Sequence, residues 1–303
     1  MKKYFINILL FFIIVVAIDV LYGVALQYMN NHAKGGAIGN RYYVCKKSND
    51  DVLIFGSSRA KHHYVPRVIE DTLGVTCYNA GEDGNGIILS YGYLKMITER
   101  YSPKLIIYDV SRFDFCEDDN VKYVNYLKPY YYEKGIDSLF WSIEPKSRIM
   151  MCSNLYRFNT TCLRILGNYL HPITSHPNGY MPLSNTMPDE MAEQMVTNEV
   201  EGKRPVDNTK LEYFEKFILL AQKKNVNVVC CVSPMYRGTK SDEFYNPVKA
   251  LCEKYDVPFM FFAYSSDVSE DRNLFQDKTH LNDRGARIFS SIVCQEIRPL
   301  LLK

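Results

Sequence analysis

The sequence lacks an excess of charge of either sign, because 36 Lys and Arg residues are matched by 34 Asp and Glu residues, for a net charge of +2. Without a basic surplus to neutralise phosphates, this composition argues against binding to nucleic acid. The nine cysteines include no Cys-x-x-Cys pair, which argues against a zinc ribbon and a thioredoxin-type dithiol. Internal repeats and low-complexity tracts are also lacking, and ordinary shares of hydrophobic (47%) and charged (23%) residues exclude a disordered, collagen-like or coiled-coil protein.

The amino-terminal segment, by contrast, is strongly apolar. Two lysines precede an apolar run over residues 4–18 that is interrupted only by Asn7, and after Asp19 the apolar character resumes as far as Leu26. A helix of about 20 such residues can cross a bilayer, whereas a carboxylate at the centre of a span costs about 2.5–3.5 kcal/mol. Since Asp19 lies toward the far end of the run, residues 1–29 are predicted to form an N-terminal transmembrane helix.

Two interpretations of this helix remain open, an uncleaved signal anchor and a cleaved signal peptide. Residues 17–19 make a poor cleavage site, which favours the anchor. The lysines at the start favour a short tail inside the cell, although further basic residues after the span weaken this bias. Because long downstream domains translocate largely regardless of nearby charge, the main domain is predicted to be extracytoplasmic, in the periplasm or at the cell surface. Some cysteines could pair there, but Cys230 and Cys231 lie in an apolar run typical of a core strand.

The polar segment 30–50 is predicted to be a stalk, and from Asp51 short apolar runs alternate with helical patterns. Strands are predicted at 52–55, 75–78, 105–110, 226–232 and 257–262, and helices at 65–73, 87–101, 209–224, 246–254 and 283–300. Such alternation indicates a parallel sheet covered by helices on both faces. Residues 51–303 are therefore predicted to form a flavodoxin-like three-layer α/β/α domain with a five-stranded parallel sheet and sites at the carboxyl ends of the strands.

One long block does not follow this alternation. Residues 113–206 contain scattered aromatic residues and prolines and show no sustained period. The block is predicted to be an irregular or helical insertion after the third strand, long enough to be a lid or a substrate-recognition subdomain.

Polar residues follow the first predicted strand in the segment Gly56-Ser57-Ser58-Arg59. A serine at a strand-to-helix turn presents its hydroxyl near unpaired helix N–H groups, an arrangement that serves a nucleophile whose developing oxyanion needs donors. The alternative is that the serines merely cap the helix. Arg59, next to the serine, could steer an anionic substrate or could be an ordinary solvated helix residue.

Two further segments follow the second and fifth predicted strands. Glycines within 79–86 let the backbone approach a ligand and direct N–H groups at an anionic oxygen, although the segment could also be an ordinary loop. Asp277 precedes His280 by three residues and could hold its imidazole, leaving the second ring nitrogen free to accept a proton from a serine. The alternative is that Asp277 or Asn282 caps the last helix and that His280 is a surface residue.

Taken together, the three segments resemble the SGNH/GDSL hydrolase superfamily, whose members have this fold and hydrolyse or transfer acyl groups. The resemblance extends from about Asp51 to Leu300, apart from the insertion. It implies that Ser58 is the nucleophile, in a Gly-Ser-Ser that replaces the family's Gly-Asp-Ser. It also implies that Gly84 supplies an oxyanion N–H alongside that of Ser58, and that Asp277 and His280 complete the catalytic trio.

The third block of the family departs from its usual form. A Gly-x-Asn-Asp is expected after the third strand, with the asparagine as a further oxyanion donor, but residues 108–114 contain no asparagine. Ser111 or Arg112 could replace it, and a missing donor costs on the order of 10²–10³ in rate. His62 and His63 follow the serine by one helical turn and are predicted to be residues of the cleft rim rather than the base.

The sequence thus predicts a membrane-anchored serine esterase that acts on acyl esters, by resemblance O-acetyl esters of cell-envelope glycans. Its partners would be an acylated glycan or another small ester and the membrane, with no metal, organic cofactor or nucleic acid. Two alternatives remain open: an O-acyltransferase onto a polysaccharide hydroxyl, and a non-catalytic glycan-binding envelope protein that retains the fold.

Overall fold

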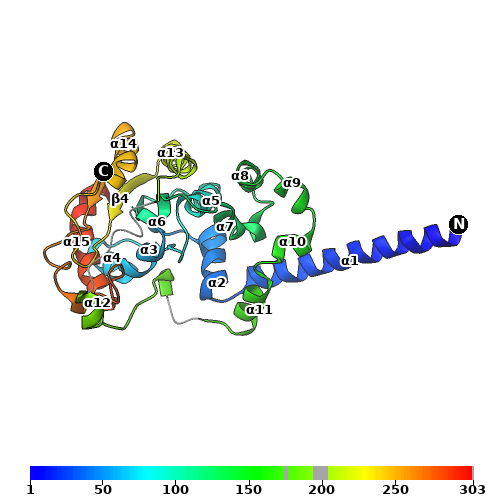
Figure 1. Cartoon of the computed structure of the whole chain (residues 1–303), viewed down its shortest axis with the longest axis horizontal. Helices are drawn as coiled ribbons and strands as arrows, with labels where there is room; N and C mark the ends of the chain where they lie inside the picture. Colours follow the sequence, from blue (N-terminus) through cyan, green and yellow to red (C-terminus); the bar gives the residue numbers. More distant parts are fainter. Residues whose placement is uncertain (174–176, 194–203, 302–303) are drawn as a thin grey trace. The chain divides into compact units, whose positions relative to one another are not determined.

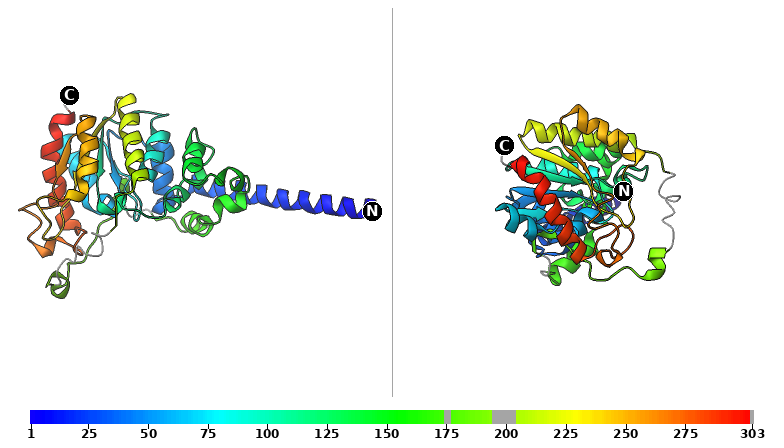
Figure 2. Two further views of the ribbon diagram at one scale, coloured as in Figure 1. Left: turned by 45° about the horizontal axis from the view of Figure 1, so that its top comes forward. Right: turned by 90° about the vertical axis from the view of Figure 1, so that its left-hand side faces the viewer.

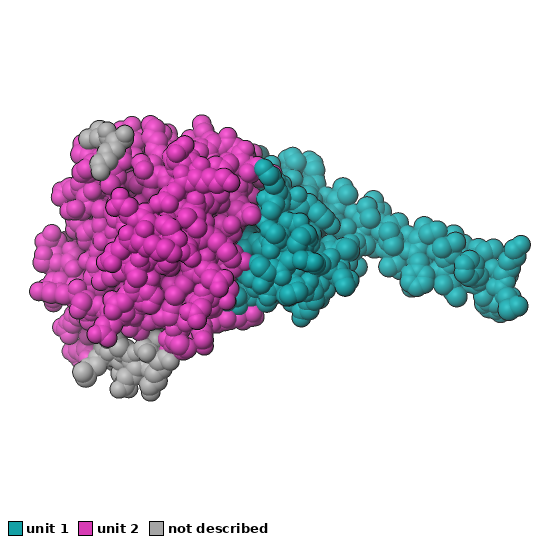
Figure 3. Space-filling view, turned by 90° about the horizontal axis from the view of Figure 1, so that it is seen from above, with its two compact units in different colours: residues 1–43, 120–175 teal, residues 44–119, 176–303 magenta. Residues whose placement is uncertain are grey.

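The computed structural model describes residues 1–173, 177–193 and 204–301 (Figure 1). The chain divides into two compact units, unit 1 with residues 1–43 and 120–175, and unit 2 with residues 44–119 and 176–303 (Figure 3). The predicted insertion is therefore split between the units, and its residues 174–176 and 194–203 lie outside the described part of the chain.

Unit 2 is built on a five-stranded parallel sheet with the strand order β2-β1-β3-β4-β5. The strands are β1 (Val52–Gly56), β2 (Cys77–Asn79), β3 (Leu105–Asp109), β4 (Asn227–Val232) and β5 (Phe259–Phe261). This order confirms the predicted flavodoxin-like arrangement, in which the carboxyl ends of the strands share one edge of the sheet.

The strands are apolar throughout because both faces of the sheet are covered. Along β1 the side chains alternate between the two faces, as the period of a strand requires. Phe55 points to one face, where its ring lies 6.0 Å from that of Phe217. Ile54 belongs to the core on the other face, together with Phe289 and Val293.

Helices cover both faces of this sheet (Figure 2). On one face, α5 (Ile87–Ile97) packs against α13 (Asn208–Lys223), with α14 (Asn246–Lys254) beside α13. On the other face, α15 (Asp283–Leu301) packs against α3 (Ser58–His63) and α4 (Pro66–Leu73). The remaining elements of unit 2 are α6 (Arg112–Phe115), η3 (Pro177–Gly179), α12 (Asp189–Glu193), η4 (Glu243–Tyr245) and η5 (Arg272–Leu274), with η1 (Tyr43–Lys47) at the boundary between the units.

The ends of these helices follow from local sequence. Helix α4 begins with Pro66, whose fixed φ suits a first helical turn, and ends at Gly74 in the left-handed conformation. Helix α13 begins after Asp207, whose carboxylate accepts the backbone N–H groups of Thr209 and Lys210. Helix α5 ends at Ile97, four residues earlier than predicted, and the hydroxyl of Thr98 at its C-cap donates to the carbonyl oxygen of Leu94.

Apart from one isolated β-bridge between Gly35 and Ile173, the regular elements of unit 1 are helices over its described residues. It contains α1 (Lys2–His32), α2 (Gly36–Tyr42), α7 (Val121–Asn125), η2 (Lys128–Tyr130), α8 (Ile136–Ile143), α9 (Ser147–Met150), α10 (Asn154–Phe158) and α11 (Cys162–Leu170). Part of the segment predicted as a stalk thus forms helix α2, whose Ile38 is fully buried and donates its backbone N–H to Asn168 on α11. The glycines of this segment therefore stand at the start of a helix and not in a flexible linker.

Among the described residues, α1 is the one helix long and apolar enough to cross a membrane, as a signal sequence or an anchor would. The carboxylate of Asp19, the residue that argued against a span, is satisfied inside unit 1. It accepts the Ser153 hydroxyl (2.9 Å) and the backbone N–H groups of Asn154 (2.9 Å) and Leu155 (2.8 Å), at the start of α10. These hydrogen bonds offset the cost of a charge in an apolar segment.

All nine cysteines are free thiols. Cys230 and Cys231 are buried in β4, as their position in an apolar run predicts.

Candidate active site

The turn from β1 to α3 places Ser58 at the carboxyl edge of the sheet. It requires glycine at position 56, where φ is +136° and a Cβ atom would lie 2.7 Å from the carbonyl oxygen of Asp109. Ser58 is the first residue of α3, so it stands among N–H groups that have no partners within the helix.

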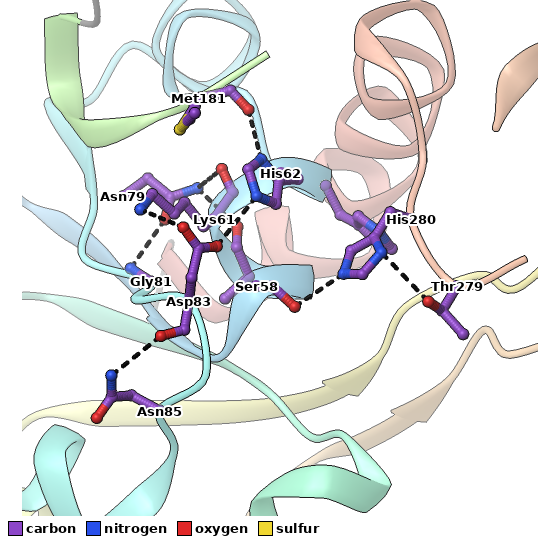
Figure 4. Close-up of polar contacts among 12 residues, drawn as sticks. Ser58, Lys61, His62, Asn79, Gly81, Asp83, Asn85, Met181, Thr279 and His280 are labelled. Carbon is purple, nitrogen blue, oxygen red and sulfur yellow. Dashed lines mark hydrogen bonds and ion pairs between the residues drawn. The ribbon is translucent and has the colours of Figure 1, made fainter. Parts of the chain in front are cut away.

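Ser58 and His280, which are 222 positions apart, meet at this edge (Figure 4). The Oγ atom of Ser58 lies 2.8 Å from Nε2 of His280. On the other side of the ring, Nδ1 lies 2.9 Å from Oδ2 of Asp277. With Nδ1 donating its proton to the carboxylate, Nε2 is left free to accept the proton of the serine hydroxyl.

The carboxylate of Asp277 is held by its own loop. Its Oδ1 accepts the backbone N–H groups of Thr279 (2.8 Å) and His280 (2.9 Å) and the Thr279 hydroxyl (3.0 Å). Burial by itself raises the pKa of Asp277, but the hydrogen bond and charge of His280 and these N–H donors lower it to about 2. Asp277 is therefore ionised at neutral pH. The contribution of the Thr279 hydroxyl was not predicted from the sequence.

The loop after β2 is tied to helix α3. The Asn79 amide donates to the carbonyl oxygens of Ala60 (2.7 Å) and Tyr64 (2.9 Å), and Asp83 accepts Lys61 Nζ (2.7 Å) and faces His62 Nε2 (3.1 Å; Figure 4). Although burial raises the pKa of the Asp83 carboxyl, these two partners hold it well below its usual range. The helix that carries Ser58 and this loop are thereby held together.

Gly84 follows Asp83 in this loop, with a φ of +66° in the left-handed region that favours glycine. It thus stands directly after a residue that is fixed to α3 by two contacts. Asn85, the next residue, is buried and donates to the carbonyl oxygen of Asp83 at 3.1 Å.

The two candidates for a third oxyanion donor are both engaged. The guanidinium of Arg112 forms two 3.0 Å hydrogen bonds with Asp242 and lies 4.6 Å from the ring of Phe244. Ser111 is buried and donates its hydroxyl to Asp114 at 2.9 Å, with its Oγ atom 3.3 Å from that of Ser57. Of the two, Ser111 is the one beside the turn that carries Ser58.

The buried carboxyl of Asp114 makes the stability of the folded protein depend on pH. Burial raises its pKa to about 7, against the opposing effect of the Ser111 hydrogen bond. Because the Asp114 carboxyl of the unfolded chain has the ordinary aspartate pKa of 3.8, the folded protein loses stability as pH rises from about 4 to 7. We expect Asp114→Asn to remove this loss, so that the free energy of unfolding of wild type, measured relative to the variant by urea denaturation in detergent, falls by about 3 kcal/mol from pH 5 to pH 8. Parallel pH profiles for the two proteins would contradict this.

Arg59 is buried, which fits neither of the two alternatives given for it, a residue that steers an anionic substrate and a solvated helix residue. It is buried and hydrogen-bonds Oγ of Ser233 through Nε (3.1 Å) and Nη2 (2.9 Å), and Nη2 also donates to the Ser233 carbonyl oxygen. Its Nε lies 3.6 Å from Oδ1 of the fully buried Asp109. The reason is rotational, since the residue after Ser58 is turned by about 100° around the helix and points toward the sheet.

Replacing Arg59 with methionine is expected to destabilise the protein by about 3–5 kcal/mol, because the carboxylate of Asp109 loses the cation beside it. The matched control is Arg67→Met on α4, whose ion pair with Asp71 is exposed to solvent and contributes no more than about 1 kcal/mol. Urea denaturation of the three proteins measures the difference, and equal losses in the two variants would contradict the assignment.

His63 is likewise not a rim residue, which corrects the prediction. It is fully buried, with Nδ1 2.8 Å from Oγ of Ser233, and its Nε2 accepts the backbone N–H of Leu281 at 3.0 Å. Burial, followed by the charge of Arg59, keeps its pKa well below the usual range. The neutral ring therefore holds the residue that follows His280. For the neighbouring residue His62, the sequence did indicate the position: His62 follows Ser58 by four residues and therefore lies on the same face of the helix.

Among the residues that the structure describes, no group of three or more His, Cys, Asp or Glu side chains is arranged to hold a metal ion.

The fold and the site together define an α/β protein whose sheet has the order 2-1-3-4-5, with a serine, a histidine and an aspartate hydrogen-bonded in sequence at its carboxyl edge. No family model matches the sequence, and no curated protein matches it. Solved structures similar to this chain include a candidate acylhydrolase and a candidate lipolytic protein of the G-D-S-L family.

Three of these neighbours illustrate the similarity. A candidate acylhydrolase from Bacteroides fragilis is 13% identical, with a TM-score of 0.39 over 84% of this chain and 90% of that one. A candidate lipolytic protein of the G-D-S-L family from Desulfitobacterium hafniense is 9% identical, with a TM-score of 0.41 over 81% and 98%. A candidate platelet activating factor from Streptococcus pneumonia is 11% identical, with a TM-score of 0.37 over 98% of each chain.

Proposed function

We propose that the protein is a serine ester hydrolase of the SGNH type. The observation that carries the proposal is the hydrogen-bonded series from Ser58 through His280 to Asp277, with distances of 2.8 and 2.9 Å. In this mechanism the Ser58 oxygen attacks the acyl carbonyl carbon while His280 Nε2 takes its proton, and Asp277 stabilises the imidazolium that forms. The backbone N–H groups of Ser58 and Gly84 are the proposed donors to the oxyanion.

The second half of the reaction uses the same groups. His280 returns the proton to the departing alcohol, which leaves an acyl ester on Ser58. A water molecule then attacks this ester with His280 again as the base, and the carboxylic acid departs as the serine regains its proton. Apart from the ester and this water molecule, the proposed reaction uses only groups of the chain.

We further propose that α1 is an uncleaved anchor and that unit 2 acts outside the cytoplasm on O-acetyl esters of cell-envelope glycans. The length and apolar character of α1 support the anchor. The substrate class rests on the resemblance to membrane-anchored members of the superfamily.

Labelling with a serine-directed fluorophosphonate tests this function on the full-length chain in detergent. We expect one adduct, located by mass spectrometry on Ser58, in the folded protein but not after heat denaturation. Absence of both labelling and p-nitrophenyl acetate hydrolysis would favour a glycan-binding protein, an alternative supported by the engagement of Ser111 and Arg112 with Asp114 and Asp242. Partition of a labelled acetyl group between water and added glycan separates hydrolysis from transfer.

A further inference from the structure

Unit 1 contains a largely buried arginine, Arg157, that contacts aromatic rings rather than an anion among the described residues. Arg157 on α10 is only 6% exposed, yet among the described residues its guanidinium has no hydrogen bond or ion pair, and its Nε atom is buried and unpaired. It lies instead against the rings of Phe158 (4.6 Å) and Tyr132 (5.0 Å). Burial lowers its pKa, and the attraction of Tyr132 and Asp19 offsets this only in part. Among the described residues, Nε is the one nitrogen of this guanidinium that is buried without a partner, so the other two are open to solvent and can pair with an anionic ligand.

Arg157 lines a cavity of about 530 Å³ within unit 1, which we call the α1 cavity. Helix α1 forms one wall with Val20, Gly23 and Val24, and the opposite wall includes Arg157 and Glu133. The volume is in the range of small-ligand sites, about 300–1,000 Å³. The α1 wall also includes Gln27, Tyr28 and Asn31, so it is apolar at its Val20 end and polar at its Asn31 end.

The place of the cavity along α1 indicates where such a ligand resides. Its wall on α1 extends from Val20 to Asn31, which at 1.5 Å per residue lie about 27 Å and 44 Å from Lys2. The hydrocarbon core of a bilayer is about 30 Å thick. If α1 crosses the membrane with its lysines at one surface, the cavity lies at the headgroup level of the other surface. This step rests on the anchoring proposed above.

A second observation that indicates contact with lipid is the exposure of apolar side chains on the helices around the cavity. Leu155 on α10 and Leu163 on α11 are 48% and 81% exposed, and Ile149 on α9 is 81% exposed. Helices α10 and α11 lie alongside α1 (Figure 1), where the Asp19 carboxylate holds the start of α10. Apolar side chains in such a position are stabilised at the boundary between headgroups and acyl chains. This favours a lipid over a small water-soluble anion.

We propose that the α1 cavity binds the headgroup of an anionic membrane phospholipid. The lipid phosphate accepts charge-assisted hydrogen bonds from Arg157, and the adjoining glycerol and acyl carbons lie along Val20 and Val24. Pairing with Arg157 favours a headgroup with a net negative charge, as in phosphatidylglycerol, over the zwitterionic headgroup of phosphatidylcholine.

The test uses the full-length chain in detergent micelles that contain phosphatidylglycerol, phosphatidylcholine or inorganic phosphate alone. Thermal unfolding reports stabilisation, and native mass spectrometry reports retained lipid. We expect wild type to retain one phosphatidylglycerol molecule and to unfold at a higher temperature in its presence than with phosphatidylcholine or phosphate. Arg157→Met is expected to bind phosphatidylglycerol about tenfold more weakly and to lose this shift. The variant should fold, because Arg157 makes no hydrogen bond or ion pair with the described residues, and methionine keeps the packing of its stem against the rings of Tyr132 and Phe158.

Arg148→Met is the matched control, because Arg148 is exposed, lies over the Trp141 ring at 4.6 Å and is outside the cavity. It should keep the full response to phosphatidylglycerol. Equal stabilisation of wild type by both lipids, or an unchanged response in Arg157→Met, would overturn the proposal, and an equal response to inorganic phosphate would overturn its lipid part.

Ser58→Ala should bind lipid as wild type does, so loss of esterase activity leaves this result untouched. A chain that fails to float with vesicles contradicts the anchor, and with it the premise of this inference. A chain that floats without a preference for phosphatidylglycerol contradicts the lipid site alone.

Discussion

Ser58→Ala is expected to lower kcat/KM for p-nitrophenyl acetate by at least about 10⁴-fold, because the variant has no oxygen at the position that His280 Nε2 faces at 2.8 Å. Any activity that remains would come from binding and from the oxyanion donors. An activated ester is the right substrate because Ser111 and Arg112, the candidates for a third oxyanion donor, are engaged with Asp114 and Asp242, so turnover of unactivated esters is expected to be slow.

Ser57→Ala is the control for this experiment. Its hydroxyl is buried and lies 3.3 Å from that of Ser111, so its loss should change kcat/KM by less than about tenfold while the fold of the β1–α3 turn is kept. If Ser57→Ala removed the activity and Ser58→Ala kept it, the assignment of the nucleophile would be wrong.

Asp277→Asn is expected to lower kcat by about 10³–10⁴-fold, because it moves the proton of the His280 imidazole from one ring nitrogen to the other. Oδ1 of Asp277 accepts the backbone N–H groups of Thr279 and His280, so the amide oxygen of an asparagine must occupy this place. Its NH₂ group then stands where Oδ2 lies 2.9 Å from Nδ1 of His280. An N–H donor at this point moves the imidazole proton to Nε2, which can no longer accept the proton of Ser58.

Asp271→Asn provides the comparison, because Asp271 also accepts a backbone N–H, from Asn273 at 2.9 Å, but has no histidine beside it. Steady-state kinetics should show wild-type kcat for this variant, and circular dichroism should show both variants folded. Retention of more than a tenth of the activity by Asp277→Asn would exclude the proposed role of the carboxylate.

The sequence was most informative where a signal is local or where the topology forces a meeting. Pro66 and Gly74 marked the ends of α4 correctly because each acts on its own backbone. Ser58 and His280 could be placed together since each follows a strand of one parallel sheet, and carboxyl ends of such strands share an edge.

Other features depended on information that a linear pattern does not contain. The inward orientation of Arg59 follows from the rotation of α3 against the sheet, and the pairing of Arg112 with Asp242 joins residues 130 positions apart. Asp19 finds its donors 134 to 136 positions later, on α10, a five-residue helix too short to show amphipathic periodicity. The sequence therefore predicted the cost of this carboxylate but not its compensation.

The contact of α1 with the rest of unit 1 bears on maturation of the chain. Leu26 of α1 is 7% exposed and shares a small core with Phe158 and Ile165. A signal peptidase that cut after residue 29 would remove this leucine together with Asp19, and would leave two buried apolar side chains open to water. The cleaved product would then lack part of the hydrophobic core of unit 1, whereas an uncleaved chain keeps α1 as a permanent part of that core.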